Sequence, residues 1–223
     1  MRKIFQYAFT GVVGLAVAGL LRQRQRPIPT PPTLTFLFEN PLVEAFAGSE
    51  LLVERLGLAP GMRVLDAGCG PGRLTIPVAR AVGPSGEVVA LDSQRAMLEK
   101  LEYRLETESI TNVRILEAGL GDGALEREAF DRVLLAFVLG EVRNRETAGR
   151  ELYAALKPGG ILSVTEGFGD PDYRRPASVR REVEPTGLEL VEYFGGFPVY
   201  TLNFRRPEHL ATHKTSPEAS DFG

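Results

Sequence analysis

From residue 62 onward, short runs of apolar residues alternate with longer segments in which apolar residues recur at helical spacing. Five such runs lie at residues 63–65, 87–91, 113–116, 132–137 and 161–165. Strands that alternate with helices along a chain are typical of a parallel sheet with crossover helices. The pattern therefore predicts an α/β domain built on a doubly wound, Rossmann-like sheet.

The last two apolar runs, residues 188–194 and 199–204, are joined by only four residues. A link of this length permits an antiparallel hairpin, whereas a parallel crossover needs a dozen or more residues. We therefore expect a seven-stranded sheet that is mostly parallel and has one antiparallel strand near the C-terminus.

The chain opens with an uncharged stretch, residues 4–21, which has two basic residues before it and arginines at positions 22, 24 and 26 after it. A membrane-spanning helix needs about 20 apolar residues, so this stretch is at the lower limit. We expect an N-terminal hydrophobic helix that anchors the chain in a membrane, either as a single pass or as a monotopic helix. Two alternatives stay open: a secretory signal peptide ending near residues 16–18, and a helix lying in the interface or against the soluble domain.

Four regions are predicted along the chain: an anchor at 1–26, a proline-rich linker at 27–40, a catalytic domain at 41–206 and a polar, disordered tail at 207–223. Four prolines between residues 26 and 35 favour an extended, semi-rigid spacer. Residues 34–58 begin with apolar and aromatic side chains and continue at helical spacing up to Gly57. This segment is expected to pack on the core, and its aromatic start is a candidate wall for an apolar substrate.

Composition and charge narrow the function. The net charge is -3 and both signs are interleaved, so no basic face for a nucleic-acid partner is expected. A single cysteine cannot form an internal disulfide. The only histidines, His209 and His213, lie in the tail, and no Cys/His cluster has zinc spacing, so neither a core histidine nor a metal site is predicted.

The strongest chemical signal is the glycine-rich turn after the first strand, which reads Asp66-Ala67-Gly68-Cys69-Gly70-Pro71-Gly72. Glycines let a backbone pass close to a ligand, and the N–H groups at the start of a helix favour a carboxylate or phosphate. The spacing is G-x-G-x-G, whereas dinucleotide sites have G-x-G-x-x-G. An acid before the turn would repel a pyrophosphate but can accept a hydrogen bond from an amino group. These features favour S-adenosylmethionine (SAM), whose amino-acid end carries an ammonium and a carboxylate, over a dinucleotide.

A second acid, Asp92, ends the apolar run of the next strand, twenty residues after Gly72. An acid at this place can accept hydrogen bonds from both hydroxyls of a ribose. NAD sites share the feature, so Asp92 predicts a nucleoside ligand without distinguishing SAM from NAD.

Residues 51–206 resemble the class I SAM-dependent methyltransferases, particularly the small ones related to the quinone-biosynthesis C-methyltransferases. The motifs that carry the resemblance follow in order at residues 64–72, 91–98, 130–133, 137–139 and 156–162. The resemblance implies that SAM is the cofactor and that the turn from Asp66 through Ala67, Gly68, Cys69 and Gly70 to Gly72 passes under its methionine part. It further implies that Asp92 holds the ribose, that residues from Ser93 to Met97 border the adenine, and that Phe137 lies beneath the sulfonium.

The chain departs from the family pattern at two places. Relatives often have Gly-Asp-Ala after the third strand, where the acid binds the adenine amino group; here either Leu120 or Asp122 takes that place, and we favour Asp122. Many relatives have histidines after the fourth strand, where this chain has Gly140-Glu141. Glu141 is the catalytic candidate, as a base or as a guide for a cationic substrate, and a helix-capping role is an equal alternative.

The anchor, combined with the lack of a large insertion that would form a lid, predicts an amphiphilic or lipid-like acceptor such as a phospholipid amine, a quinone precursor or another isoprenoid. Because SAM is made in the cytosol, the catalytic domain is expected to face the cytoplasm. Acids and arginines between residues 167 and 176 are expected mainly to be solvated. A homo-oligomer is possible. The alternative functions are an NAD(P)-dependent oxidoreductase and an inactive, membrane-anchored SAM-binding protein.

Overall fold

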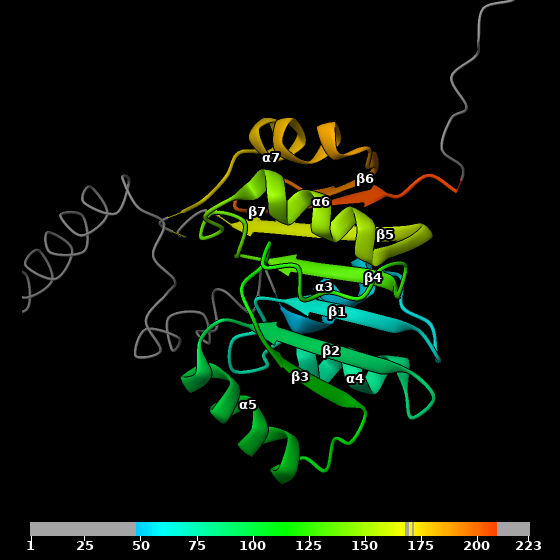
Figure 1. The fold of residues 1–223 in the computed structure, drawn as a ribbon, viewed down its shortest axis with the longest axis vertical. Helices are drawn as coiled ribbons and strands as arrows, with labels where there is room; N and C mark the ends of the chain where they lie inside the picture. Colours follow the sequence, from blue (N-terminus) through cyan, green and yellow to red (C-terminus); the bar gives the residue numbers. More distant parts are fainter. Residues whose placement is uncertain (1–47, 168–169, 171, 209–223) are drawn as a thin grey trace, which may run out of the picture.

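The computed structural model describes residues 48–167, 170 and 172–208 (Figure 1). The predicted anchor, linker and tail, at residues 1–26, 27–40 and 207–223, lie outside these residues except for Pro207 and Glu208. No helix in the described part of the chain is long and apolar enough to span a membrane.

Seven strands form one sheet in the order β3-β2-β1-β4-β5-β7-β6. Neighbouring strands are parallel from β3 to β5, whereas β7 runs antiparallel to both β5 and β6. This confirms the prediction of a mostly parallel sheet with one reversed strand. The strands are β1 (Arg63–Ala67), β2 (Glu87–Asp92), β3 (Val113–Glu117), β4 (Phe130–Ala136), β5 (Leu156–Gly167), β6 (Glu189–Gly195) and β7 (Val199–Arg205).

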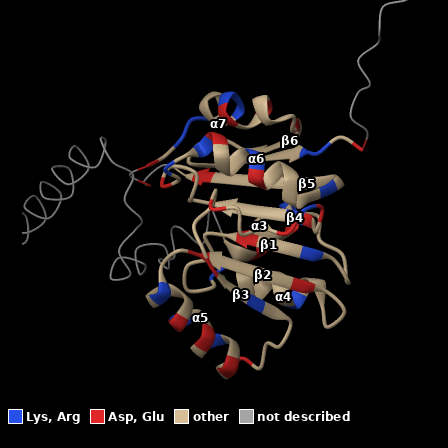
Figure 2. Cartoon of the chain, viewed as in Figure 1, with Lys and Arg blue, Asp and Glu red and all other residues tan. Residues whose placement is uncertain are grey.

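Helices cover both faces of the sheet, because each crossover returns the chain to the start of the next parallel strand. One face carries α3 (Ser49–Arg55), α4 (Thr75–Val82) and α5 (Arg95–Thr107), and the other carries α6 (Arg145–Ala155), α7 (Pro176–Val183) and the short 3-10 helix η2 (Glu184–Thr186). In Figure 1, α6 lies in front of the sheet and α4 behind it. Acidic and basic residues alternate along α5 in Figure 2, as expected of a solvated helix face.

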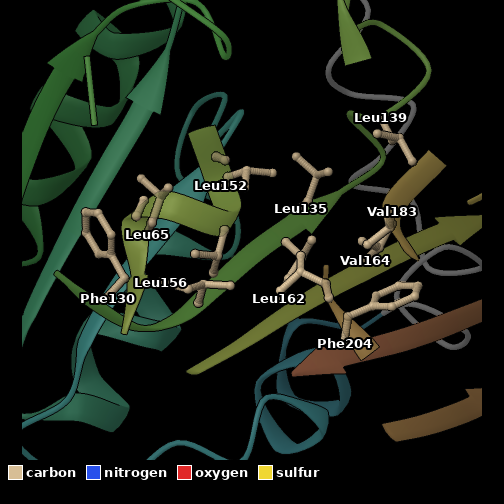
Figure 3. Packing of buried hydrophobic residues seen from close by; sticks show 14 of the residues in the cluster. Leu65, Phe130, Leu135, Leu139, Leu152, Leu156, Leu162, Val164, Val183 and Phe204 are labelled. Carbon is tan, nitrogen blue, oxygen red and sulfur yellow. The ribbon is translucent and has the colours of Figure 1, made fainter. Parts of the chain in front are cut away.

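Buried apolar side chains pack in two layers, one on each face of the sheet. In the larger one, Leu65, Leu135, Leu162 and Phe204 from four strands meet the α6 and α7 side chains (Figure 3). Alternate strand residues, such as Val64, Val88 and Leu134, face α3 and α4 instead. Because every one of these side chains is at most 1% exposed, the strands are apolar on both faces, which is why they appear as continuous runs in the sequence.

Most strand boundaries lie within two residues of the predicted ones, and the start of the fifth strand differs by more. The fifth strand begins at Leu156, five residues before the predicted start at residue 161, because Leu156 already pairs with Phe130. The pairing register then shifts before Arg132 meets Ile161. The glycines within the Lys-Pro-Gly-Gly stretch accommodate this irregularity: a Cβ on Gly160 would lie 2.8 Å from the carbonyl oxygen of Lys157.

Candidate functional site

The glycine-rich turn leaves the carboxyl end of β1 and bends over the end of β2. The amides of Gly68 and Cys69 both donate to the Leu91 carbonyl, at 2.7 and 3.0 Å. Gly68 and Gly70 have positive φ angles of 79° and 52°, which glycine adopts without strain. The turn is therefore fixed by backbone hydrogen bonds to the neighbouring strand, and the Asp92 carboxylate adds a hydrogen bond to the Gly70 amide.

The glycines of the turn serve different purposes. A Cβ on Gly68 would lie 2.4 Å from the Val138 Cγ2 atom, and one on Gly72 would lie 2.4 Å from the Leu101 Cδ1 atom, so both are needed for packing. A Cβ on Gly70 would meet nothing within 4 Å. The open space above Gly70 is thus the part of the turn that a ligand can approach.

Asp66 is buried at the end of β1, and its Oδ2 atom accepts a hydrogen bond of 2.7 Å from the Thr75 hydroxyl. Burial raises the pKa of this carboxyl to about 6, against the lowering effect of the Thr75 hydrogen bond. An acid with this pKa is mostly ionised at neutral pH. It can therefore accept a further hydrogen bond from an ammonium group placed above the turn.

Asp92 is also buried, and both of its oxygens contact backbone amides. One oxygen accepts from Gly70 at 2.9 Å and the other from Gln94 at 2.8 Å. Each carboxylate oxygen has a second lone pair, so Asp92 can hold the turn and still accept hydrogen bonds from two hydroxyls.

A cavity of about 620 Å³ lies at the carboxyl edge of the sheet, between the turn and the loops that follow β2, β3 and β4. Ten of the twelve predicted site residues line it: Asp66, Gly68, Cys69, Gly70, Asp92, Ser93, Met97, Asp122, Phe137 and Glu141. Both candidates for the adenine contact, Leu120 and Asp122, are in its wall. Its volume is within the range of sites that enclose a molecule of cofactor size.

Two predicted contacts do not line the cavity. Ala67 is fully buried within the core that packs on α6, because alternate strand residues point to opposite faces. Gly72 is turned toward Leu101 of α5. Their roles are to pack the strand and the helix behind the site.

The wall beside the turn is built from the end of β4 and the start of α6. Phe137 has a φ angle of 60°, unusual for a residue other than glycine, and its amide donates to the Thr165 carbonyl at 2.9 Å. The Arg73 guanidinium lies 5.8 Å from the centre of the Phe137 ring. The Arg73 side chain, which comes from the turn, therefore covers the apolar end of the cavity that Phe137 forms.

Asp122 has a structural contact of its own. Its Oδ2 atom accepts a hydrogen bond of 2.8 Å from the Gly119 amide, which closes the loop after β3. Asp122 is exposed at the rim, whereas Leu120 is half-buried and packs against the core.

The pattern along the chain gave no sign of several lining residues. Arg73 follows the turn, and Arg143, Asn144 and Thr147 lie at the start of α6, where Asn144 caps the helix by accepting from the Thr147 amide. Of these residues, only Asn144 carries a signal in the sequence, because asparagine is a preferred residue at the N-cap of a helix. These residues reach the cavity because the loop after β4 places the start of α6 beside it.

The loop after β5 is less solvated than expected. Asp170 and Asp172 are half-buried, and burial raises the pKa of Asp170 to about 6. Glu166, which precedes the loop, is fully buried; its Oε2 atom accepts from the Arg174 amide at 3.3 Å, and its Oε1 atom has no hydrogen-bond partner among the described residues. Burial, with the nearby Asp170 charge, raises the pKa of Glu166 to about 8. Its carboxyl is therefore mostly protonated at neutral pH.

Comparison with known proteins agrees with this geometry. Residues 64–160 match the family model described as a methyltransferase domain. A demethylmenaquinone methyltransferase from Geobacillus is 34% identical over 114 residues, which cover 51% of this chain and 49% of the relative. A ubiquinone/menaquinone biosynthesis C-methyltransferase from Ectopseudomonas mendocina is 40% identical over 120 residues, or 53% of this chain and 46% of the relative. The chain thus matches about half the length of these relatives.

Solved structures share the fold. A SAM-dependent methyltransferase from Aquifex aeolicus superposes with a TM-score of 0.73 at 21% identity, over 79% of this chain and 99% of the other. A phosphoethanolamine N-methyltransferase from Haemonchus contortus, in complex with SAM, superposes with a TM-score of 0.65 at 16% identity, over 77% of this chain and 55% of the other.

The fold and the site define the class: this is a Rossmann-like domain with a cavity of cofactor size at the carboxyl edge of its sheet. With the family match, residues 64–160 belong to the class I SAM-dependent methyltransferases, and the cofactor of the domain is SAM.

Proposed function

We propose that this chain transfers the methyl group of SAM to an amphiphilic, lipid-like small molecule at a membrane. The observation that carries the proposal is the 620 Å³ cavity, which has the open glycine turn on one side and two buried acids in its wall. The cavity offers an acceptor for an ammonium group and, separately, an acceptor for a pair of hydroxyls. SAM carries both groups.

Within this cavity, the chain's own residues fit the cofactor. Asp66 would accept from the ammonium, and the carboxylate would lie over the open face of Gly70. The Asp92 carboxylate, already held by two backbone amides, would accept from the ribose hydroxyls. Ser93, Met97 and the loop that holds Leu120 and Asp122 would enclose the adenine. Phe137, Val138 and Glu141 then border the end at which the methyl group lies.

When bound, SAM supplies an electrophilic methyl group on a positively charged sulfur, so the protein has to orient the acceptor and exclude water. The Phe137 ring and the Val138 side chain present apolar surface at this end of the cavity. Glu141 is half-buried beside them, close enough to the cavity to face an acceptor. It would take the proton that the acceptor atom loses when it forms its new bond to carbon, or it would attract a cationic amine.

The acceptor that we favour is the ring of a quinone precursor, because two of the relatives are named as methyltransferases of demethylmenaquinone and of ubiquinone/menaquinone biosynthesis. A phospholipid amine and other isoprenoids belong to the same amphiphilic class. The uncharged residues 4–21 support an acceptor that is reached from a membrane. The catalytic domain would then face the cytoplasm, where SAM is made.

The test is incubation of the full chain with SAM carrying an isotopically labelled methyl group and with extracted membrane lipids, followed by mass spectrometry. We expect a labelled product in the quinone fraction, and much less of it with Asp92→Asn. A labelled phospholipid would support methyltransferase activity and would identify a phospholipid, not a quinone precursor, as the acceptor. SAM binding without any labelled lipid product would leave the alternative of an inactive SAM-binding protein and would overturn the proposal.

A further inference from the structure

Exposed apolar side chains gather on one hairpin. Among the described residues, four large hydrophobic side chains are exposed, and three of them lie on the β6–β7 hairpin: Phe197 at 84%, Tyr193 at 55% and Val191 at 38%. The fourth is Tyr103 on α5, at 70%. Single exposed hydrophobic residues are ordinary, but a cluster at a chain turn indicates a contact surface.

The tip of this hairpin lies at the same edge of the sheet as the cavity. Because β6 is parallel to the strands β1 to β5, its end at Gly195 is at the carboxyl edge, and Phe197 follows two residues later. Behind the tip, Tyr200 makes edge-on ring contacts with Tyr193 at 6.1 Å and with Tyr173 at 6.2 Å. The Tyr200 hydroxyl also donates to the Arg174 carbonyl at 2.5 Å, which ties the hairpin to the loop after β5.

The described part of the chain, which starts with α3, begins at this edge too. The helix α3 ends beside the start of β4, where the Leu56 and Gly57 carbonyls accept from Arg132 at 2.8 and 3.3 Å. Because α3 runs antiparallel to the strands, its first residues lie toward their carboxyl ends, on the left in Figure 1. The described part of the chain therefore begins on the side where the cavity and the hairpin tip lie.

Charge at this edge is mixed. Arg143 at the cavity rim and Arg175 before α7 are exposed cations, and the blue stretch leading into α7 in Figure 2 lies on this side. Asp122 is an exposed anion at the rim, and Glu141 and Asp172 are half-buried. Because cations and anions are present in similar number, this edge has little net charge. We therefore expect the exposed aromatic side chains to contribute more than charge to a contact between this edge and a surface.

We propose that the tip of the β6–β7 hairpin, with Phe197 at its apex and Tyr193 behind it, inserts into the headgroup region of a lipid bilayer and turns the mouth of the cavity toward the membrane. The inference rests on the proposed function, in that it takes residues 4–21 as the tether to the same bilayer. Aromatic side chains concentrate at membrane interfaces because a ring can be buried while polar groups beside it stay hydrated. An amphiphilic acceptor would enter the cavity from the bilayer without crossing water.

Because the chain contains no tryptophan, a single Phe197→Trp substitution gives a fluorescent probe at the tip. The full-length variant is mixed with phosphatidylcholine vesicles, with and without one-fifth phosphatidylglycerol and with lipids carrying a quencher at the top of the acyl chain. We expect the emission to shift to shorter wavelength and to lose about half of its intensity to the quencher, as for a side chain 5–10 Å below the surface. The matched control is Tyr103→Trp, whose emission should change little.

Three results would overturn the inference: unchanged, unquenched emission of the Phe197→Trp variant while the protein sediments with the vesicles, equal quenching of both variants, and failure of the full chain to bind vesicles. A fourth is a blue shift without vesicles that grows with protein concentration, since a second copy of the chain would then cover the hairpin. SAM binding, measured on the same samples, separates the two proposals. Intact SAM binding with an unquenched probe would reject only the membrane contact, whereas lost SAM binding in the unsubstituted chain would reject the proposed function.

Discussion

At the scale of single residues, the glycine turn shows that three similar positions have different physical requirements. Gly68 and Gly72 are needed because side chains from the β4 loop and α5 fill the space where a Cβ would lie. Gly70 is different because the space beside it is empty and belongs to the cavity. Substitution by alanine therefore separates a packing role from a binding role.

We predict that Gly70→Ala leaves the domain folded but weakens SAM binding at least about tenfold, because the added methyl group occupies the cavity. Its cost to stability should be about 1 kcal/mol, the cost of a left-handed conformation for alanine. Gly68→Ala should destabilise the domain by clearly more, because its methyl group overlaps Val138. Thermal unfolding and calorimetric titration with SAM measure the two effects; equal losses of stability in both variants would contradict the distinction.

A second prediction concerns Asp92. Asp92→Asn removes the charge that accepts from two backbone amides and, in the proposal, from the ribose, so SAM affinity should fall about 10- to 100-fold, as for the loss of hydrogen bonds to a charged group. The matched control is Glu106→Gln on the exposed face of α5, outside the cavity, where we expect no measurable change in SAM affinity. Asp122→Asn tests the favoured adenine contact at the cavity rim, where the carboxylate also accepts from the Gly119 amide. A loss of affinity greater than about threefold would support Asp122 as that contact, and a smaller change would favour Leu120.

At the scale of elements, the loop that follows β5 is organised around a buried acid. The carboxyl of Glu166 lies under the Arg174 backbone with Asp170 close by, and Arg174 also forms an ion pair with Glu182 of α7. Since the pKa of Glu166 is raised to about 8, the folded state holds a proton that the unfolded chain releases near pH 4.5. Stability then depends on pH in a direction that can be tested.

Because the folded state binds more protons, the free energy of unfolding should fall as pH rises through the range from 4.5 to 8. Between pH 7 and 8, where Asp66 and Asp170 are mostly ionised because their pKa values are about 6, the loss assigned to Glu166 should be about 1 kcal/mol. Glu166→Gln should flatten this part of the profile, and Glu106→Gln on the exposed face of α5 should not. Urea unfolding at several pH values measures the slope; an unaltered slope in Glu166→Gln would show that another group is responsible.

The order and bounds of most elements followed from the sequence because strands buried on both faces have continuous apolar runs, as Val88 to Leu91 and Val133 to Leu135 show. The early start of β5 did not, because the pairing of Leu156 with Phe130 depends on a register shift that leaves no mark on the apolar pattern. Likewise, residues close to a motif in sequence, such as Ala67, point away from the cavity, while Arg143 and Thr147 reach it from the loop before α6 and from the first turn of that helix. Side-chain direction and the meeting of distant loops are properties of the packed fold.

At the scale of the whole molecule, one edge of the sheet gathers the groups that the proposed reaction needs. The glycine turn, Asp92, the β4 loop and the start of α6 enclose one cavity there, and the exposed tip of the β6–β7 hairpin lies at the same edge. A parallel sheet brings the carboxyl ends of its strands together, which is why loops that are distant in sequence form a single site. Since a ligand that binds only the folded state stabilises it, SAM at a hundred times its dissociation constant should add about 2.7 kcal/mol to the stability of the domain.

Isothermal titration calorimetry of the full chain with SAM measures whether this cavity binds the cofactor. We expect one SAM bound per chain, a dissociation constant well below about 1 mM, displacement by S-adenosylhomocysteine, and no comparable binding of NADH. Absence of SAM binding at millimolar concentration, or tighter binding of NADH than of SAM, would contradict this expectation.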